Sequence, residues 1–150
     1  MNIPRKLPIG VQSFKDLREK DFLYVDKTEY LFRLTTGGKV YFLSRPRRFG
    51  KSLFLSTLAA YFRGQKELFK GLYLEQVEEE QAARENRAAW LEYPVLYLDF
   101  NVGKYTDTDA LNERLHVLLG EAEKKYGITA LKEEQPFFAS RFEKLLKIIY

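Results

Sequence analysis

A short basic segment carries the residue types that bind phosphate groups. Gly50 lets the backbone approach a phosphate without a Cβ in the way. Lys51 is placed to reach the β- and γ-phosphates of a nucleotide, and the Ser52 hydroxyl is placed to bind Mg²⁺. The sequence therefore predicts a site for ATP with Mg²⁺. The predicted nucleotide-binding residues are Arg45, Pro46, Arg47, Arg48, Phe49, Gly50, Lys51, Ser52 and Leu53.

Apolar residues flank this loop on both sides. Residues 39–43 form an apolar run typical of a buried strand, and residues 53–62 form one typical of a buried helix. Strand, loop and helix in this order are the context in which the P-loop motif G-x-x-x-x-G-K-[S/T] binds phosphate. The motif's first glycine is replaced by Arg45. Either Pro46 helps to build the entry of the loop differently, or the phosphate cradle is imperfect and binding is weakened.

The same basic residues support a second hypothesis, in which the loop binds nucleic acid. The loop has four cations, and the chain has 25 basic against 21 acidic residues, a net charge of +4. Basic clusters bind phosphate backbones without reading sequence. The charges are spread along the chain, however, with no long basic stripe or arm. The alternative function is therefore a non-catalytic basic module that binds nucleic acid or a partner protein through the arginine-rich loop.

Composition excludes several classes of protein. The hydrophobic content of 45% with 31% charged residues is typical of a globular domain, and 150 residues are enough for one core. No apolar run approaches the ~20 residues that a membrane span needs. The absence of cysteine excludes disulfides and thiolate metal sites, and a single histidine argues against structural zinc. With no apolar region after the N-terminus, we expect a cytoplasmic protein without a membrane partner.

Periodicity and capping signals indicate the elements that position the loop. Helices are predicted near residues 13–19, 26–37, 53–62, 75–90, 110–127 and 136–149, with Glu78, Glu79 and Glu80 as a solvated charged face. Core strands are predicted at residues 39–43 and 93–100. This order favours an α/β fold, a P-loop NTPase-type parallel sheet flanked by helices. Two or three strands are few for such a sheet, so we expect it to be incomplete at the C-terminus.

Four blocks in this order resemble the predicted AAA-ATPase-like family, bacterial proteins that often carry a C-terminal PD-(D/E)XK nuclease-like region. The blocks are residues 8–10 with Phe14, 24–28, 44–53 and 93–100. The resemblance implies that an arginine-rich start of the loop, in place of the motif's first glycine, is typical of the family. Arg45 therefore need not disable the site. The resemblance implies that residues 1–36 are a lead-in and helix, and that 37–150 are the P-loop core. It also implies that the Walker B acidic residues and the nuclease-like region lie in sequence that this chain lacks.

Other candidates have weaker support. Asp99 ends a predicted strand where a Walker B aspartate binds Mg²⁺, but Phe100 replaces the catalytic glutamate that usually follows, and a loop cap is the alternative role. Tyr24 and Phe14 are candidates for packing near an adenine ring, with a core role favoured. No catalytic residue can be assigned. The resemblance implies that the intact protein is an ATPase, and we expect this chain alone to hydrolyse ATP poorly.

Four further residues have structural or open roles. Asp26 is expected to cap a helix rather than to act as a catalyst. Lys27 and Thr28, which lie in a block that the family shares, are candidates for contact with the nucleotide or with a neighbouring element. His116 stands alone on a predicted helix, without a second ligand or nucleophile nearby, and receives no role.

Overall fold

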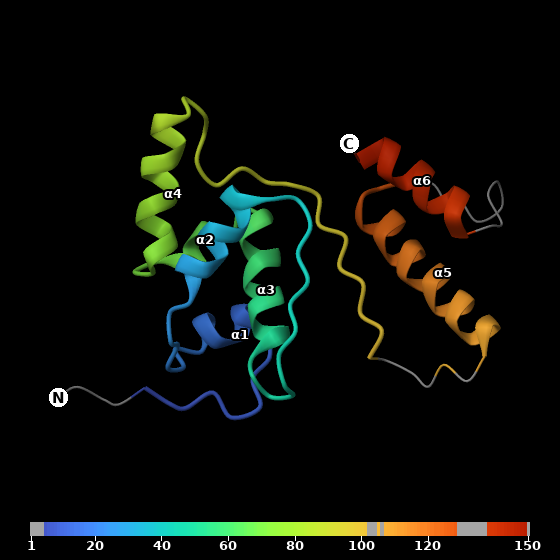
Figure 1. The fold of residues 1–150 in the computed structure, drawn as a ribbon, viewed down its shortest axis with the longest axis horizontal. Helices are drawn as coiled ribbons and strands as arrows, with labels where there is room; N and C mark the ends of the chain where they lie inside the picture. Colours follow the sequence, from blue (N-terminus) through green and yellow to red (C-terminus); the bar gives the residue numbers. More distant parts are fainter. Residues whose placement is uncertain (1–4, 102–104, 106, 129–137, 150) are drawn as a thin grey trace. The chain divides into compact units, whose positions relative to one another are not determined.

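The computed structural model describes residues 5–101, 105, 107–128 and 138–149 (Figure 1). Its elements are α1 (Phe14–Glu19), α2 (Thr28–Gly37), α3 (Lys51–Phe62), the 3₁₀ helix η1 (Lys66–Phe69), α4 (Tyr73–Arg84), α5 (Thr108–Lys125) and α6 (Phe138–Ile149). The chain divides into two compact units, Met1–Val95 and Leu96–Tyr150. The first unit contains α1 to α4, and the second contains α5 and α6.

An aromatic and aliphatic core holds the first unit together. Its buried members are Phe14, Leu31, Ala60, Phe69 and Leu74. The ring of Phe14 lies 5.0 Å from that of Phe69 and 5.3 Å from that of Tyr24. Helix α1 packs against α3, and α2 packs against α4. Because this core fixes both α2 and α3, it also fixes the two ends of the segment that connects them.

The sequence predicts Ser13 as the cap of the first helix and Thr108 or Asp107 as the cap of the fifth, and the structure has side-chain caps at Ser13 and Asp107. The Ser13 hydroxyl accepts a hydrogen bond from the Asp16 backbone N–H (3.2 Å) at the start of α1. The Asp107 carboxylate accepts one from the Ala110 backbone N–H (2.8 Å) at the start of α5. Both bonds satisfy backbone donors that a helix leaves free in its first turn. The predicted start of the last helix at Pro136 lies outside the described residues.

The predicted α/β fold with a parallel sheet is wrong for the residues that the structure describes. Those residues contain helices and no strand, and backbone pairing between segments is limited to isolated bridges, Lys6 with Phe22 and Arg63 with Glu92. Residues 39–43 and 93–100 form no strand, and the side chains of Val40 and Phe42 are 91% and 93% exposed. An apolar run predicts a strand only if a second strand lies beside it to complete the ladder. Here no described segment supplies one.

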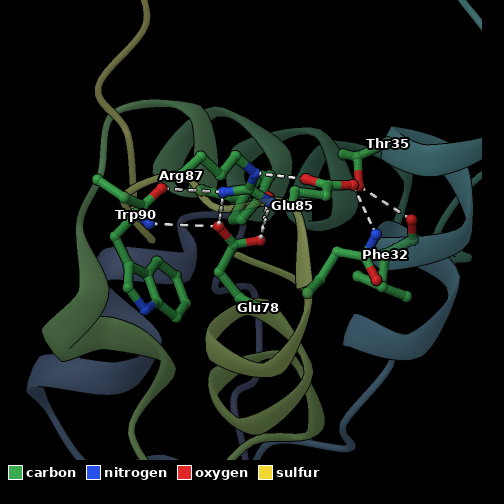
Figure 2. A network of polar contacts seen from close by, with 9 residues as sticks. Phe32, Thr35, Glu78, Glu85, Arg87 and Trp90 are labelled. Carbon is green, nitrogen blue, oxygen red and sulfur yellow. Dashed lines mark hydrogen bonds and ion pairs between the residues drawn. The ribbon is translucent and has the colours of Figure 1, made fainter. Parts of the chain in front are cut away.

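The prediction of a wet acidic face on the fourth helix is wrong at Glu78. This residue is only 1% exposed, and its carboxylate pairs with the guanidinium of Arg87 at 2.7 Å (Figure 2). Helix α4 ends at Arg84, and Asn86 takes a left-handed backbone conformation with φ 52°. This turn brings Arg87 back onto Glu78, so the helix is shorter than the predicted span of 75–90.

The second unit is built on the packing of α5 against α6. Its buried apolar residues are Leu119, Ala122 and Leu145. A buried ion pair accompanies them: the Arg141 guanidinium donates to both carboxylate oxygens of Glu123, each at 2.6 Å. Arg141 also lies 3.0 Å from Nδ1 of His116, which gives that histidine a structural contact. None of the helices in the described residues has the length and apolar character needed to cross a bilayer.

Candidate functional site

The basic loop leads directly into α3, as the sequence predicts. Figure 1 shows the chain leaving α2 as a long extended segment and entering α3 through this loop. Two residues of the loop take left-handed backbone conformations, Arg48 with φ 67° and Gly50 with φ 74°. Arg45 has an ordinary φ. The conformation that favours glycine therefore falls at positions 48 and 50, and position 45 does not require a glycine in this loop.

The start of α3 presents backbone donors at the end of the loop. Gly50 is the N-cap residue, and no side chain of the described residues caps this helix. The first backbone hydrogen bond of α3 runs from the Phe54 N–H to the Gly50 carbonyl oxygen (2.9 Å). The N–H groups of Lys51, Ser52 and Leu53 occupy the first turn, where they add to the positive end of the helix dipole. This end of the helix can accept a negatively charged group.

The side chains of the first turn differ in position. The Lys51 ammonium folds back across the loop and donates a hydrogen bond to the Arg45 carbonyl oxygen. This contact closes the loop into a ring and places the ammonium over its backbone. Ser52 is exposed, and so are Arg47 and Arg48 in the loop itself. Predicted site residues from Arg45 to Ser52 therefore lie together around one turn of backbone.

A cavity of about 290 Å³ opens beside the loop. Four cationic side chains contribute to its lining, namely Lys27, Arg33, Arg45 and Lys51. The remaining residues are Gly50 and the apolar Tyr30, Leu34, Leu43, Phe49 and Phe54. None of its described lining residues is acidic. Arg33 is paired with Glu29 (2.5 Å), so the attraction of this cavity for anions depends mainly on Lys27, Arg45 and Lys51.

The cavity wall on the α2 side is held by a hydrogen-bonded clamp. One oxygen of the Asp26 carboxylate accepts from the Thr28 N–H (2.8 Å) and hydroxyl (2.7 Å), and the other accepts from the Tyr73 N–H (2.8 Å). The buried Thr28 hydroxyl in turn accepts from the Leu74 N–H (3.0 Å). Asp26 and Thr28 thus join the starts of α2 and α4. Lys27 lies between them, so its backbone is fixed at the edge of the cavity.

Sequence reasoning missed three cavity residues of α2, and also Leu43 and Phe54 on either side of the loop. Tyr30, Arg33 and Leu34 come from α2, which reaches the loop through tertiary packing. A signal was nonetheless present, because Lys27, Tyr30 and Leu34 recur at the spacing of one helix face. Tyr24 and Phe14, the earlier candidates for an aromatic contact, pack against each other, and Phe14 is fully buried in the core.

Asp99 belongs to the second unit, whereas the loop belongs to the first. Its carboxylate accepts a hydrogen bond from the Asn101 N–H (2.8 Å), and its carbonyl oxygen accepts one from the Arg114 guanidinium (3.1 Å). These are the contacts of a loop cap. No cluster of three or more histidine or acidic residues that could hold a metal ion occurs in the described part of the chain. The role of Asp99 in binding Mg²⁺ stays a prediction.

A basic loop that ends in glycine and continues into a helix N-terminus is an arrangement that suits phosphate. The family described as Predicted AAA-ATPase matches residues 8–150, and the chain belongs to this family.

One relative is a protein of Azotobacter chroococcum mcd 1 described as "Uncharacterized protein in vnfD 5'region". It is 41% identical over 145 residues, which are 95% of this chain and 26% of that protein. The chain therefore spans about a quarter of the length of this relative. No solved structure matches the chain.

Proposed function

We propose that this chain binds ATP together with Mg²⁺ at the loop and the first turn of α3. The observation that carries the proposal is that Gly50 and Lys51, at the uncapped start of α3, line a cationic cavity, with the exposed Ser52 in the same turn. Membership of the predicted AAA-ATPase family supports a nucleotide as the ligand. In this proposal the phosphates lie against the N–H groups from position 47 to 53.

Each side chain has a distinct part in holding the triphosphate. The Lys51 ammonium exchanges the Arg45 carbonyl for β- and γ-phosphate oxygens, a stronger interaction because both partners are then charged. The exposed Ser52 hydroxyl is the ligand that the loop offers to Mg²⁺. The metal, when bound, neutralises part of the charge on the phosphates. Arg47 and Arg48 add positive charge around the same loop.

Hydrolysis needs more than this loop supplies. A water molecule has to be positioned for attack, usually by a carboxylate or an amide side chain. None of the described residues that line the cavity is acidic, and none carries an amide side chain. We therefore propose that the chain by itself binds ATP and turns it over slowly. ATPase activity of the longer protein is part of the same proposal.

Calorimetric titration with ATP and Mg²⁺ tests this function. We expect the wild type to bind, and Lys51→Ala and Lys51→Met to bind at least about tenfold more weakly, because a charge-assisted hydrogen bond contributes about 1.5–3 kcal/mol. Lys15→Ala is the matched control, since it removes the same charge from an exposed position of α1. Circular dichroism checks that each variant is folded. Ser52→Ala should bind ATP without Mg²⁺ as the wild type does, but lose the gain that the metal brings.

The nucleic-acid hypothesis gives a different result in the same experiment. A folded wild type that binds no ATP, yet binds single-stranded DNA with steep salt dependence, would overturn the proposed function. In that case Lys51→Ala reduces the salt slope by about one charge and changes affinity only slightly.

A further inference from the structure

The cavity beside the loop combines cations with exposed aromatic rings. Tyr30, from α2, is 58% exposed, and Phe49, from the loop, is 61% exposed. Both rings line the same cavity as Lys51 and Arg45. Phosphate binding uses the cations and the backbone donors, but it leaves these two apolar rings without a function.

Aromatic rings beside a phosphate site suit a nucleotide base. A base stacks on an aromatic side chain through its π-face, and this contact contributes affinity whichever base is present. The cavity volume of about 290 Å³ lies at the lower end of the range of about 300–1,000 Å³ for ligand pockets. It is therefore of a size for one small ligand group rather than for several bases of a strand.

We propose that this cavity holds the base of the bound nucleotide against Tyr30 and Phe49 while the phosphates lie on the loop. The inference rests on the proposed function and adds a base subsite to it. Lys27 stands at the edge of the cavity, held by the clamp of Asp26 and Thr28, and its ammonium is a further contact for the sugar–phosphate part of the ligand. Helix α2 thus contributes to recognition although it lies outside the loop motif.

A second cavity competes for the base. It has a volume of about 270 Å³ and shares Lys27, Gly50 and Phe54 with the first. Its lining is mainly aliphatic, and its rings are the shared Phe54 and the half-buried Tyr24, which packs on Phe14 in the core. Lys27 is the sole cation among its described lining residues. It also contains no arginine or lysine of the loop. The greater number of cations and the two exposed rings, Tyr30 and Phe49, therefore favour the first cavity.

The experiment compares ATP with inorganic tripolyphosphate, which has the phosphates but no base. Both are titrated with Mg²⁺ into the full chain as wild type, Tyr30→Ala, Tyr30→Phe and two controls. Val25→Ala tests the second cavity, and Tyr73→Ala removes a similarly exposed tyrosine from α4 that lines neither cavity. Circular dichroism checks folding. Should Tyr30→Ala be unfolded, Tyr30→Leu keeps an apolar side chain at that position while removing the aromatic face.

We expect the wild type to bind ATP at least about fivefold more tightly than tripolyphosphate, the lower end of a base–aromatic contact. Tyr30→Ala should lose this preference by weakening ATP alone, and Tyr30→Phe should keep it. Both controls should match the wild type.

Three results overturn the base subsite. One is equal binding of ATP and tripolyphosphate by the wild type, which leaves the phosphate site standing. The second is loss of the ATP preference in Val25→Ala instead of Tyr30→Ala, which places the base in the other cavity. The third is tighter binding of a single-stranded oligonucleotide than of ATP, which assigns the rings to nucleic acid. Failure of the folded wild type to bind either phosphate compound overturns the proposed function itself, and the base subsite with it.

Discussion

At the scale of single residues, Glu78 shows how one buried carboxylate joins several segments (Figure 2). It accepts hydrogen bonds from the Tyr61 hydroxyl (2.7 Å), the Arg87 guanidinium (2.7 Å) and the Trp90 backbone N–H (3.2 Å). Burial raises the pKa of Glu78, but the hydrogen bonds from Arg87, Tyr61 and Trp90 outweigh that effect, so the pKa lies below its usual value. Burial and the neighbouring carboxylate raise the pKa of Tyr61, which stays protonated and donates.

This arrangement predicts a specific dependence of stability on pH. Because the folded-state pKa of Glu78 is below the unfolded value of about 4.3, its charged form stabilises the fold fully above that value. The contribution is lost as the pH falls through the folded-state pKa. We expect Glu78→Gln to lower the free energy of unfolding by about 2 kcal/mol at neutral pH, and the difference from wild type to shrink below about pH 4. Urea unfolding across this pH range measures it.

Glu79 supplies the matched control for this measurement. It is the next residue of α4, but it is exposed and pairs with Lys66 at the surface (2.6 Å). Glu79→Gln should change the free energy of unfolding by at most about 1 kcal/mol, the usual contribution of an exposed ion pair. Equal losses of unfolding free energy in the two variants at neutral pH would contradict the assignment of Glu78 as a buried carboxylate that stabilises the fold.

At the scale of elements, the sequence is informative where the signal is local. The helix starts at Ser13 and Asp107 were predictable because each cap bonds a backbone N–H only three residues away. The burial of Glu78 was not, because it depends on Tyr61, which lies 17 positions away in α3. A run of three glutamates predicts a solvated surface, because the run itself does not show that Tyr61 packs against one of them. The two predicted strands failed for the same reason, since a strand is defined by a neighbour that the run itself does not specify.

The candidate site likewise has a part that the local sequence predicts and a part that depends on tertiary packing. The loop and the start of α3 could be located from Gly-Lys-Ser between two apolar runs, a pattern contained in adjacent residues. The cavity could not, because Tyr30 and Arg33 reach it only through the packing of α2 in the tertiary structure. Position 45 illustrates a third limit. The motif indicates a missing glycine there, whereas the left-handed backbone conformations occur at Arg48 and Gly50.

The extended segment before the loop gives a test at this scale. Phe42 is 93% exposed, so Phe42→Ala should change the free energy of unfolding by no more than about 0.5 kcal/mol. Phe69→Ala is the matched control, because Phe69 is fully buried in the core and its truncation should cost about 3–5 kcal/mol. Urea denaturation of both variants measures the difference. A loss of several kcal/mol in Phe42→Ala would show that its ring is buried in solution.

At the scale of the whole molecule, the two units have cores of different strength. The first buries Phe14, Leu31, Phe69 and Leu74 completely and surrounds them with further aromatic rings. Among the residues that the structure describes, the second buries fewer apolar side chains, and it also buries the ion pair of Arg141 with Glu123. A buried ion pair contributes little net stability, because removing both charges from water offsets much of their attraction. The first unit therefore has the larger source of folding free energy.

This difference predicts how the units behave when they are separated. We expect residues 1–95 to show a helical circular dichroism spectrum and a cooperative thermal transition on their own, because their core is contained within that range. Residues 96–150 should melt without a cooperative transition, since a helix pair of this size buries too little apolar surface to fold stably alone. The proposed ATP site lies wholly in residues 1–95, so its affinity for ATP with Mg²⁺ should stay within about twofold of the full chain, a difference of about 0.4 kcal/mol. An unfolded 1–95 fragment would show that the second unit is required for the first to fold. A folded fragment with much weaker ATP binding would instead show that residues beyond Val95 contribute to the site.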